Sequence, residues 1–292
     1  MAPFDRNDGA RPRGGFRMLA FDLDGTFLEP DGRLHETTAR FLAKVRSGGI
    51  ELVAATGRRL WSALPVLERL ELDGSVVVHN GAMVARVPAA TSERTWRIAP
   101  DVVREVVADL SRRGLSVLIF TDAPRGPAEV LAQDGGVDPT GYLAWYFHYA
   151  FGHFSLFPDL VGAPLEGVLR VAGHGPRGVL EEAARELPRR FPGVVRAFVQ
   201  RENVMDAHRV ELMAAGADKW SGVRWVAAQR SIAAGQILAV GDETNDIEML
   251  AGTGWSLAAP GASDLARASA REVVADAETP ALLRALGRVL DA

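Results

Sequence analysis

The stretch Met18-Leu19-Ala20-Phe21-Asp22-Leu23-Asp24-Gly25-Thr26 decides the fold of this chain. It begins as an apolar run, which predicts a buried strand, and Gly25 marks the end of that strand. Asp22 and Asp24 then stand two residues apart. At the end of a central strand of an open parallel sheet, both acids would face the crevice in which such sheets bind ligands. The alternative interpretation is a surface turn, because Asp and Gly are common turn residues.

Three later segments favour the crevice over the turn. The first, Glu51-Leu52-Val53-Ala54-Ala55-Thr56-Gly57-Arg58, places a hydroxyl and a glycine amide after an apolar run, where they can hold a phosphate oxygen. The second, Gly216-Ala217-Asp218-Lys219, precedes a helix-like segment. Lys219 is one of only two lysines among the 33 basic residues, and its compact charge suits neutralisation of a nucleophile beside a phosphate. A solvated surface lysine is the alternative.

The third segment is Gln236-Ile237-Leu238-Ala239-Val240-Gly241-Asp242-Glu243-Thr244-Asn245-Asp246, an apolar run followed by a glycine, three acids and an amide. Oxygen-rich clusters of this kind suit Mg²⁺, which prefers carboxylates, carbonyls and retained water. An ordinary helix N-terminus is the alternative, since Asp and Asn cap helices and offset their dipole. We expect both interpretations to apply, to different members of the cluster.

Together these segments resemble the four motifs of the haloacid dehalogenase (HAD) superfamily. The matching residues are Asp22-x-Asp24-Gly25-Thr26, Thr56-Gly57-Arg58, Lys219 and Gly241-Asp242-x-x-Asn245-Asp246. The chain is more narrowly similar to the Cof-type sugar-phosphate phosphatases, which carry a large cap of the C2B type between the second and third motifs. Asn80-Gly81-Ala82 also matches that branch, at the point where the chain enters the cap.

The order of elements predicts an α/β fold with two interleaved domains. Strand-like runs alternate with helix-like segments, which indicates a Rossmann-like parallel sheet with helices on both faces. The expected strands are 17–23, 51–56, 75–80, 236–241 and 271–275, and the expected helices are 36–47, 60–70, 219–230, 245–252, 262–269 and 279–290. We predict a disordered tail at 1–16, a HAD-like core at 17–81 and 216–292, and an inserted α+β cap at 82–215.

Within the cap we expect helices at 100–113 and 177–190 and strands at 115–121, 168–173, 194–200 and 210–213. The aromatic segment 142–154 is interpreted as core packing or an interface patch, with a sugar-stacking wall as the alternative. His148 and His153 are five residues apart and do not form a recognised zinc pair. Arg170 and Glu211 are candidates for contacting a substrate hydroxyl or carboxylate.

The residue types indicate phosphoryl transfer. Asp22 is the predicted nucleophile, forming an aspartyl-phosphate, and Asp24 would protonate the leaving alkoxide and later take a proton from water. The resemblance implies that Mg²⁺ is held by Asp22, the backbone carbonyl of Asp24, Asp242 and, directly or through water, Asp246. The predicted phosphate-binding groups are the Leu23 backbone amide, Thr56, Gly57, Lys219 and Asn245.

Three side chains receive looser assignments. Asn245 contacts either the phosphate or the motif loops. Thr26 is expected to fix the loop that carries Asp24. Arg58 is expected to anchor a helix start or the cap.

Composition excludes several classes of function. The 292 residues are 48% hydrophobic, enough for two cores, and a net charge of −4 gives no support to a nucleic-acid partner. Cysteine is absent, which excludes disulfides, thiolate metal sites and a cysteine nucleophile. No stretch has the length of a membrane span and residues 1–15 lack the apolar centre of a secretory signal, so we expect a cytoplasmic protein.

We predict a Mg²⁺-dependent phosphatase that acts on small phosphorylated metabolites, with sugar phosphates as the first choice. One alternative is a phosphohexomutase, since mutases with a similar cap share the Asp-x-Asp-Gly-Thr signature. The other is a non-catalytic binding or regulatory protein on the same scaffold. The oligomeric state is open.

Overall fold

The computed structural model describes residues 15–28, 32–34, 36–123, 129–149, 153–202, 206–275 and 279–291. The chain divides into two compact units, residues 1–93 with 218–292, and residues 94–217. We call the first the core unit and the second the cap unit. Their boundaries lie later in the chain than the expected ones at 81/82 and 215/216. Most of the predicted tail, residues 1–14, lies outside the described residues.

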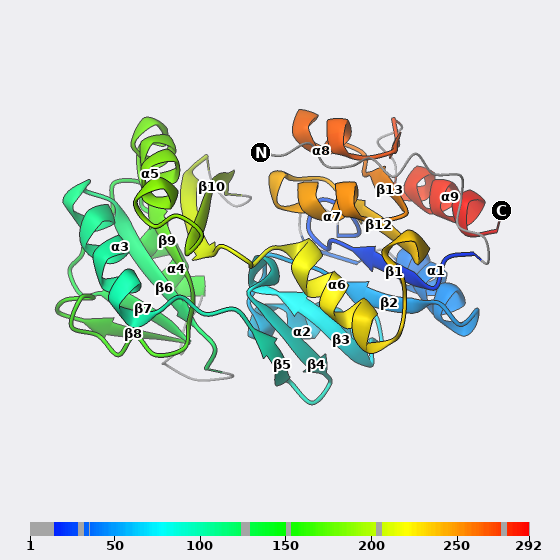
Figure 1. Cartoon of the computed structure of the whole chain (residues 1–292), viewed down its shortest axis with the longest axis horizontal. Helices are drawn as coiled ribbons and strands as arrows, with labels where there is room; N and C mark the ends of the chain where they lie inside the picture. Colours follow the sequence, from blue (N-terminus) through cyan, green and yellow to red (C-terminus); the bar gives the residue numbers. More distant parts are fainter. Residues whose placement is uncertain are drawn as a thin grey trace. The chain divides into compact units, whose positions relative to one another are not determined.

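A five-stranded sheet forms the centre of the core unit (Figure 1). Its order is β14-β13-β12-β1-β2 and every neighbouring pair is parallel, which confirms the predicted parallel sheet. The strands are β1 (Met18–Phe21), β2 (Glu51–Ala54), β12 (Ile237–Gly241), β13 (Trp255–Ala258) and β14 (Glu272–Val273). All four residues of β1 are fully buried, as their apolar run predicts.

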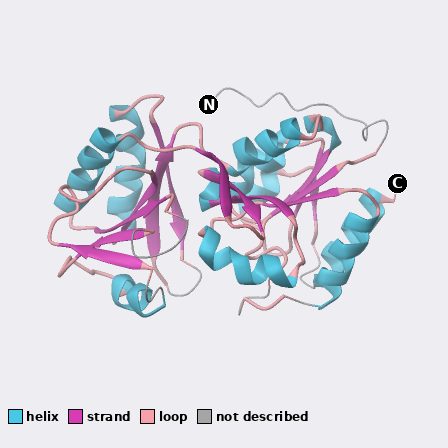
Figure 2. Cartoon of the chain, turned by 90° about the horizontal axis from the view of Figure 1, so that it is seen from below, coloured by secondary structure: helices cyan, strands magenta, loops and turns pink. Residues whose placement is uncertain are grey.

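Helices lie on both sides of this sheet (Figure 2). They are α1 (Glu36–Ser47), α2 (Leu60–Arg69), α6 (Lys219–Gln229), α7 (Ile247–Gly252), α8 (Asp264–Ser269) and α9 (Thr279–Leu290), with 3₁₀ turns η1 (His79–Gly81), η2 (Ala234–Gln236) and η3 (Thr244–Asp246). Helix α1 packs against α9, and α7 packs against both α6 and α8. The predicted helices of the core are therefore confirmed to within a few residues at their ends.

The predicted strand 75–80 differs from expectation in its partners. It becomes β3 (Gly74–Val78), which pairs antiparallel with β4 (Met83–Val87) in a separate sheet completed by β5 (Thr91–Thr95). Among the described residues, its pairing with the main sheet is one parallel bridge, from Ala55 to Val77. The short connection through η1 makes β3 and β4 an antiparallel hairpin, because a parallel pair would need a crossover of a dozen or more residues. This hairpin extends the core unit beyond residue 81.

The cap unit is built on a six-stranded sheet of order β10-β11-β9-β6-β7-β8, in which only β7 and β8 pair in parallel. Its strands are β6 (Ser116–Thr121), β7 (Val130–Gln133), β8 (Phe154–Phe157), β9 (Val168–His174), β10 (Val195–Arg201) and β11 (His208–Ala214). Its helices are α3 (Pro100–Arg112), α4 (Tyr142–Tyr149) and α5 (Arg177–Arg190). Sequence analysis did not predict β7 and β8, which are only four residues long, or the helical form of α4.

The cap sheet carries different layers on its two faces. Helix α3 packs on β6 and β9, and α5 packs on β10 and β11, over a core of aliphatic side chains. A second cluster joins Tyr142, Leu143 and Tyr146 of α4 to β6 and β7. These three side chains are buried and Trp145, Phe147 and Phe154 pack partly buried against the cluster, whereas Tyr149 is exposed, so part of the described aromatic segment packs as core. Within the described parts of the chain, no helix combines the length and hydropathy needed to cross a membrane.

Candidate active site

Three adjacent strands deliver the polar residues of the site to one edge of the core sheet. Asp22 directly follows β1, Asp242 directly follows β12, and Thr56 lies two residues beyond β2. The register pairs Phe21 with both Ala54 and Val240, so the three strands end within one residue of the same level. Because the carboxyl ends of parallel strands share one edge, side chains that follow them meet in one crevice.

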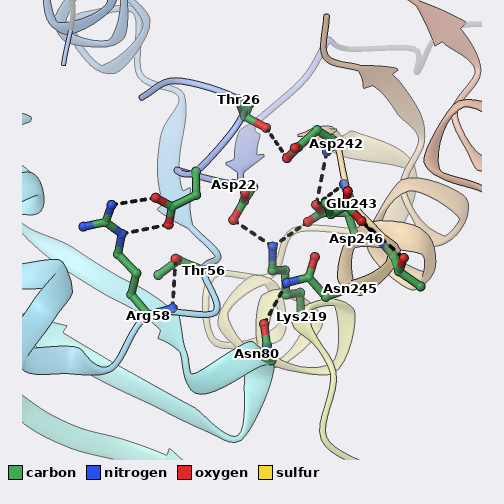
Figure 3. Close-up of polar contacts among 12 residues, drawn as sticks. Asp22, Thr26, Thr56, Arg58, Asn80, Lys219, Asp242, Glu243, Asn245 and Asp246 are labelled. Carbon is green, nitrogen blue, oxygen red and sulfur yellow. Dashed lines mark hydrogen bonds and ion pairs between the residues drawn. The ribbon is translucent and has the colours of Figure 1, made fainter. Parts of the chain in front are cut away.

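Lys219 joins two of the acids (Figure 3). Its Nζ lies 2.7 Å from Asp22 Oδ1 and 2.8 Å from Asp246 Oδ1, and its side chain is 1% exposed. Lys219 is the first residue of α6, whose N-terminal end disfavours a positive charge. Burial works to lower the pKa of Lys219, but the carboxylates of Asp22 and Asp246 outweigh it and raise that pKa. The lysine is therefore held charged against the predicted nucleophile.

Asp246 is fully buried and uses both of its oxygens within the site. Oδ1 accepts from Lys219, and Oδ2 accepts from the backbone amides of Asp242 and Glu243 at 3.2 Å each. A carboxylate that accepts several such bonds holds both the turn after β12 and the lysine in place. Asp246 thus orients the two other groups as well as adding negative charge.

The loop after β1 comes very close to Asp242. A Cβ on Gly25, whose φ is +74°, would lie 2.1 Å from Asp242 Oδ2, so only glycine fits here. Thr26 Oγ1 donates to Asp242 Oδ1 at 3.1 Å. The carbonyl of Leu23 accepts from the amides of Phe27 and Leu28, which closes the loop. The Thr26 side chain therefore connects its loop to the acid after β12, and its expected role in fixing the loop that carries Asp24 stays a prediction.

The acids of this cluster exceed the positive charge that faces them. Burial raises the pKa of Asp22 well above its ordinary value, and Asp246, Asp242 and Asp24 raise it further against the opposing effect of Lys219. Burial and Asp246 raise the pKa of Asp242 from 3.8 to about 7. Both shifts have the same physical cause, a crowded set of buried carboxylates around a single ammonium.

These residues fit a divalent cation. One carboxylate oxygen from each of Asp22, Asp242 and Asp246 lies within 4.8 Å of the other two. The Oδ1 atom of Asn245 is buried and has no hydrogen-bond partner among the described residues, so it is an acceptor that its described neighbours leave unused. A hard cation would offset the excess negative charge, and an all-oxygen set suits Mg²⁺.

Asn80 holds the loop after β2, which contains the predicted phosphate-binding residues Thr56 and Gly57. The Asn80 amide donates to the Thr56 carbonyl at 3.1 Å, and its side-chain Oδ1 accepts from Asn245 Nδ2 at 2.8 Å. A Cβ on Gly57 would lie 2.7 Å from Asn80 Oδ1, so glycine permits this approach. The described contact of Asn245 is thus with the loop after β3, which is one of the two roles expected for it.

Asn80 itself stands in a strained turn. His79 and Asn80 have φ values of +52° and +54°, a region in which residues other than glycine are uncommon. A Cβ on the following Gly81 would lie 2.0 Å from the carbonyl oxygen of Asp218, beside Lys219. The η1 turn therefore packs tightly against the start of α6, which helps to place the lysine.

Asp24 has a cation of its own. Arg58 Nε donates to Asp24 Oδ2 at 2.7 Å and Arg58 Nη2 donates to Asp24 Oδ1 at 2.5 Å, a two-pronged ion pair (Figure 3). The Asp24 side chain is 31% exposed, whereas the Asp22 side chain is 6% exposed. The two acids of the first motif are therefore separated, one facing Lys219 in the interior and one facing Arg58 near the surface.

The structure thus brings the sequence-predicted site residues together in the core unit. Sequence analysis missed two contacts, Arg58 with Asp24 and Asn80 with Asn245. Arg58 was expected to anchor a helix start or the cap, and it does donate weakly to the Ser62 carbonyl in α2, at 3.4 Å. The sequence indicated only that Arg58 and Asn80 lie in motif-like segments, and this did not predict which residues they contact.

Comparisons with known proteins agree with this geometry. A family model described as haloacid dehalogenase-like hydrolase matches residues 19–125 and 166–286. The chain is 26% identical over 240 residues to an HMP-PP phosphatase of Serratia proteamaculans, covering 82% of each chain. It is 26% identical over 277 residues to the 5-amino-6-(5-phospho-D-ribitylamino)uracil phosphatase YitU of Bacillus subtilis, covering 92% of this chain and 96% of that one.

Solved structures share the fold. A phosphatase of the haloalkanoate (HAD) superfamily from Bacteroides thetaiotaomicron aligns with a TM-score of 0.78 and 21% identity, covering 97% of this chain and 98% of that one. A haloacid dehalogenase-like hydrolase from the same organism aligns with a TM-score of 0.75, covering 94% and 99%. The family model spans most of the chain and residues of both units. The chain therefore belongs to the haloacid dehalogenase-like hydrolases and is a Cof-type phosphatase of that family.

Proposed function

We propose that this phosphatase is Mg²⁺-dependent and hydrolyses small phosphorylated metabolites, sugar phosphates foremost, through an aspartyl-phosphate on Asp22. The observation that carries the proposal is the buried cluster in which Lys219 bridges Asp22 and Asp246 at 2.7 and 2.8 Å beside Asp242. A phosphate monoester is a dianion near neutral pH, so an attacking carboxylate needs concentrated positive charge beside it.

Asp22 and Asp24 divide the chemistry between them. Asp22 attacks phosphorus, and Asp24 gives a proton to the leaving oxygen and then takes one from the water that hydrolyses the intermediate. Lys219 neutralises part of the charge on Asp22. The separate cations that face the two acids support this division, because each acid is held in its own direction.

The remaining groups bind the phosphoryl oxygens and the cation. Asp22 and Asp242 would ligate Mg²⁺ together with the Asp24 carbonyl, and Asp246 would do so directly or through water. When bound, the cation supplies charge neutralisation for the nucleophile and the phosphoryl group. The phosphoryl oxygens would be held by the Leu23 amide, Thr56, Gly57, Lys219 and Asn245.

The choice of a sugar-like substrate rests on a relative. YitU acts, by its name, on a compound with a 5-phospho-D-ribityl chain, which is a phosphorylated sugar alcohol. The HMP-PP phosphatases are also named for a small phosphorylated compound. We therefore propose small phosphate esters with a polyol or sugar as the leaving group.

The test is phosphate release from p-nitrophenyl phosphate and a panel of sugar phosphates, with Mg²⁺ and with EDTA. We expect release that requires Mg²⁺ in the wild type and is lost in Asp242→Asn. Mg²⁺ should also raise the melting temperature of the wild type and leave that of Asp242→Asn unchanged. Asp264→Asn, an exposed acid of α8, is the matched control and should behave as wild type.

Two results would contradict the proposal. Phosphate release that persists in EDTA would show that the reaction does not require Mg²⁺. Conversion of sugar 1-phosphates to 6-phosphates with little free phosphate would favour a phosphohexomutase instead.

A further inference from the structure

Arg58 grips the side chain of Asp24 at both oxygens. The guanidinium donates from Nε and Nη2 at 2.7 and 2.5 Å. A two-pronged pair of this kind fixes the plane of the carboxylate, which a single point charge does not. Each carboxylate oxygen has two lone pairs, so the pair leaves a second lone pair on each oxygen for proton exchange. Asp24 can therefore be held and still react.

The arginine is itself anchored in the loop after β2. Its backbone amide donates to Thr56 Oγ1 at 3.1 Å, and its carbonyl accepts from the His79 amide at 2.9 Å. The carbonyl of Thr56 in turn accepts from the Asn80 amide. The direction of Asp24 is therefore tied to the same loop that supplies the proposed phosphate-binding groups Thr56 and Gly57.

We propose that Arg58 is a positioning residue that aims the Asp24 carboxyl group at the leaving oxygen and at the attacking water. The inference rests on the proposed function, in which Asp24 exchanges those protons. Loss of Arg58 leaves Asp24 in place but free to rotate, because its side chain is 31% exposed. Arg58→Met should therefore slow the steps that need Asp24 and spare those that do not.

The two half-reactions differ in this need when p-nitrophenyl phosphate is the substrate. In the first, the bond from phosphorus to the ester oxygen breaks as the bond to Asp22 forms, and p-nitrophenolate leaves without needing a proton. In the second, water bonds to phosphorus, the bond to Asp22 breaks, and Asp24 takes a proton of the water. For a sugar phosphate the leaving alkoxide also needs the Asp24 proton, so both steps depend on Asp24.

The experiment is rapid-mixing kinetics on wild type, Arg58→Met and Arg58→Lys, with Mg²⁺. In Arg58→Met we expect a burst of about one p-nitrophenolate per active site, followed by turnover about tenfold to a hundredfold slower than wild type. This loss lies at or below the lower end of the roughly 10²- to 10⁴-fold that general acid–base catalysis contributes, because Asp24 itself remains. A sugar phosphate hydrolysed by the wild type should show the fall without a burst. Arg58→Lys keeps the charge without the fork and should restore turnover only in part.

Arg40→Met is the matched control, because Arg40 is a 69% exposed arginine that pairs with Glu36 on α1. It should match the wild type. An Arg58 variant that is folded and slowed without a burst, or slowed only through a higher KM, would overturn the positioning role, as would unchanged kinetics in Arg58→Lys and Arg58→Met. A wild type without Mg²⁺-dependent phosphate release would instead overturn the proposed function on which the inference rests.

Discussion

Each unit of this protein contains a buried cluster of charged side chains, and the two clusters differ in balance. In the core unit, Asp22, Asp242 and Asp246 surround the single ammonium of Lys219. In the cap unit, the carboxylates of Glu202 and Glu211 meet the guanidinium groups of Arg170 and Arg209, and His174 lies 3.1 Å from Glu202. The first set is short of positive charge and the second is not.

The pKa values respond accordingly. Burial and like charges raise the pKa of Asp22, and raise that of Asp242 to about 7. Burial also works to raise the pKa of Glu202, but Arg209 and His174 outweigh it and lower that pKa to about 2. A group perturbed toward an unfavourable charge state marks a functional site more often than a group that its neighbours satisfy. The imbalance supports the proposal that the core cluster is the reactive one.

The balanced cluster also explains two candidates from the sequence. Arg170 and Glu211 were candidates for contacting substrate, and the structure shows them paired with each other, with Glu211 fully buried. They lie on the neighbouring strands β9 and β11, together with His174 and Arg209. Their described contacts connect the strands of the cap sheet.

The largest expected effect is that of Asp22→Asn in the core cluster, which should lower activity without lowering stability. Asp22→Asn should lower turnover at least about 10⁴-fold, which corresponds to about 5 kcal/mol of activation free energy, because an amide cannot replace the nucleophile. Its free energy of unfolding without metal should not fall, since the change removes one of three crowded carboxylates. Phosphate release and urea unfolding in EDTA measure the two quantities. Turnover within tenfold of wild type would exclude Asp22 as nucleophile.

The next prediction concerns a substitution that removes one negative charge from the cap cluster. Glu211→Gln leaves Arg170 and Arg209 with too little negative charge, and removal of one partner of a buried ion pair costs about 3–5 kcal/mol of unfolding free energy. Glu105→Gln provides the control, because Glu105 pairs with Arg190 on the surface and should cost about 1 kcal/mol or less. Urea unfolding gives both values. Equal losses of unfolding free energy in the two variants would show that the buried cluster contributes no more to stability than a surface ion pair.

The smallest expected effect is on the pH dependence of stability, which should have opposite signs for Glu202 of the cap cluster and Asp242 of the core cluster. The pKa of Glu202 falls from 4.5 unfolded to about 2 folded, so its stabilisation is complete above pH 4.5 and is lost as pH falls toward 2. At about 1.4 kcal/mol per pKa unit this amounts to about 3 kcal/mol. The pKa of Asp242 rises from 3.8 to about 7, so its contribution in metal-free protein is present below pH 3.8 and is lost as pH rises toward 7.

Unfolding of wild type, Glu202→Gln and Asp242→Asn across pH 3–7 in EDTA checks this prediction. Relative to wild type, Glu202→Gln should lose less stability as pH falls, and Asp242→Asn should lose less as pH rises. If the unfolding free energies of the two variants, each taken relative to wild type, changed with pH in the same direction, the contrast between the clusters would be contradicted.

Much of the core unit could be predicted from the sequence because its signals are local. A short apolar run that ends in Asp22, Thr56 or Asp242 indicates a buried strand with a polar exit, and parallel strands bring such exits to one edge. The helices followed from spacing and composition in the same way. The weak predictions were short elements such as β7 and β8, whose four residues carry too little pattern, and β3, whose partner depends on the turn after it.

By itself, the sequence determined which residue types stand at the strand ends, and hence the class of chemistry. Only the tertiary structure decided which cation faces which acid. Lys219 meets Asp22 across 197 residues, Asn245 meets Asn80 across 165, and Arg58 meets Asp24 across 34. Such pairings depend on how distant segments pack, and a residue's own neighbours in the chain carry no record of them. The same physical reason separates the unbalanced cluster of the core from the balanced cluster of the cap.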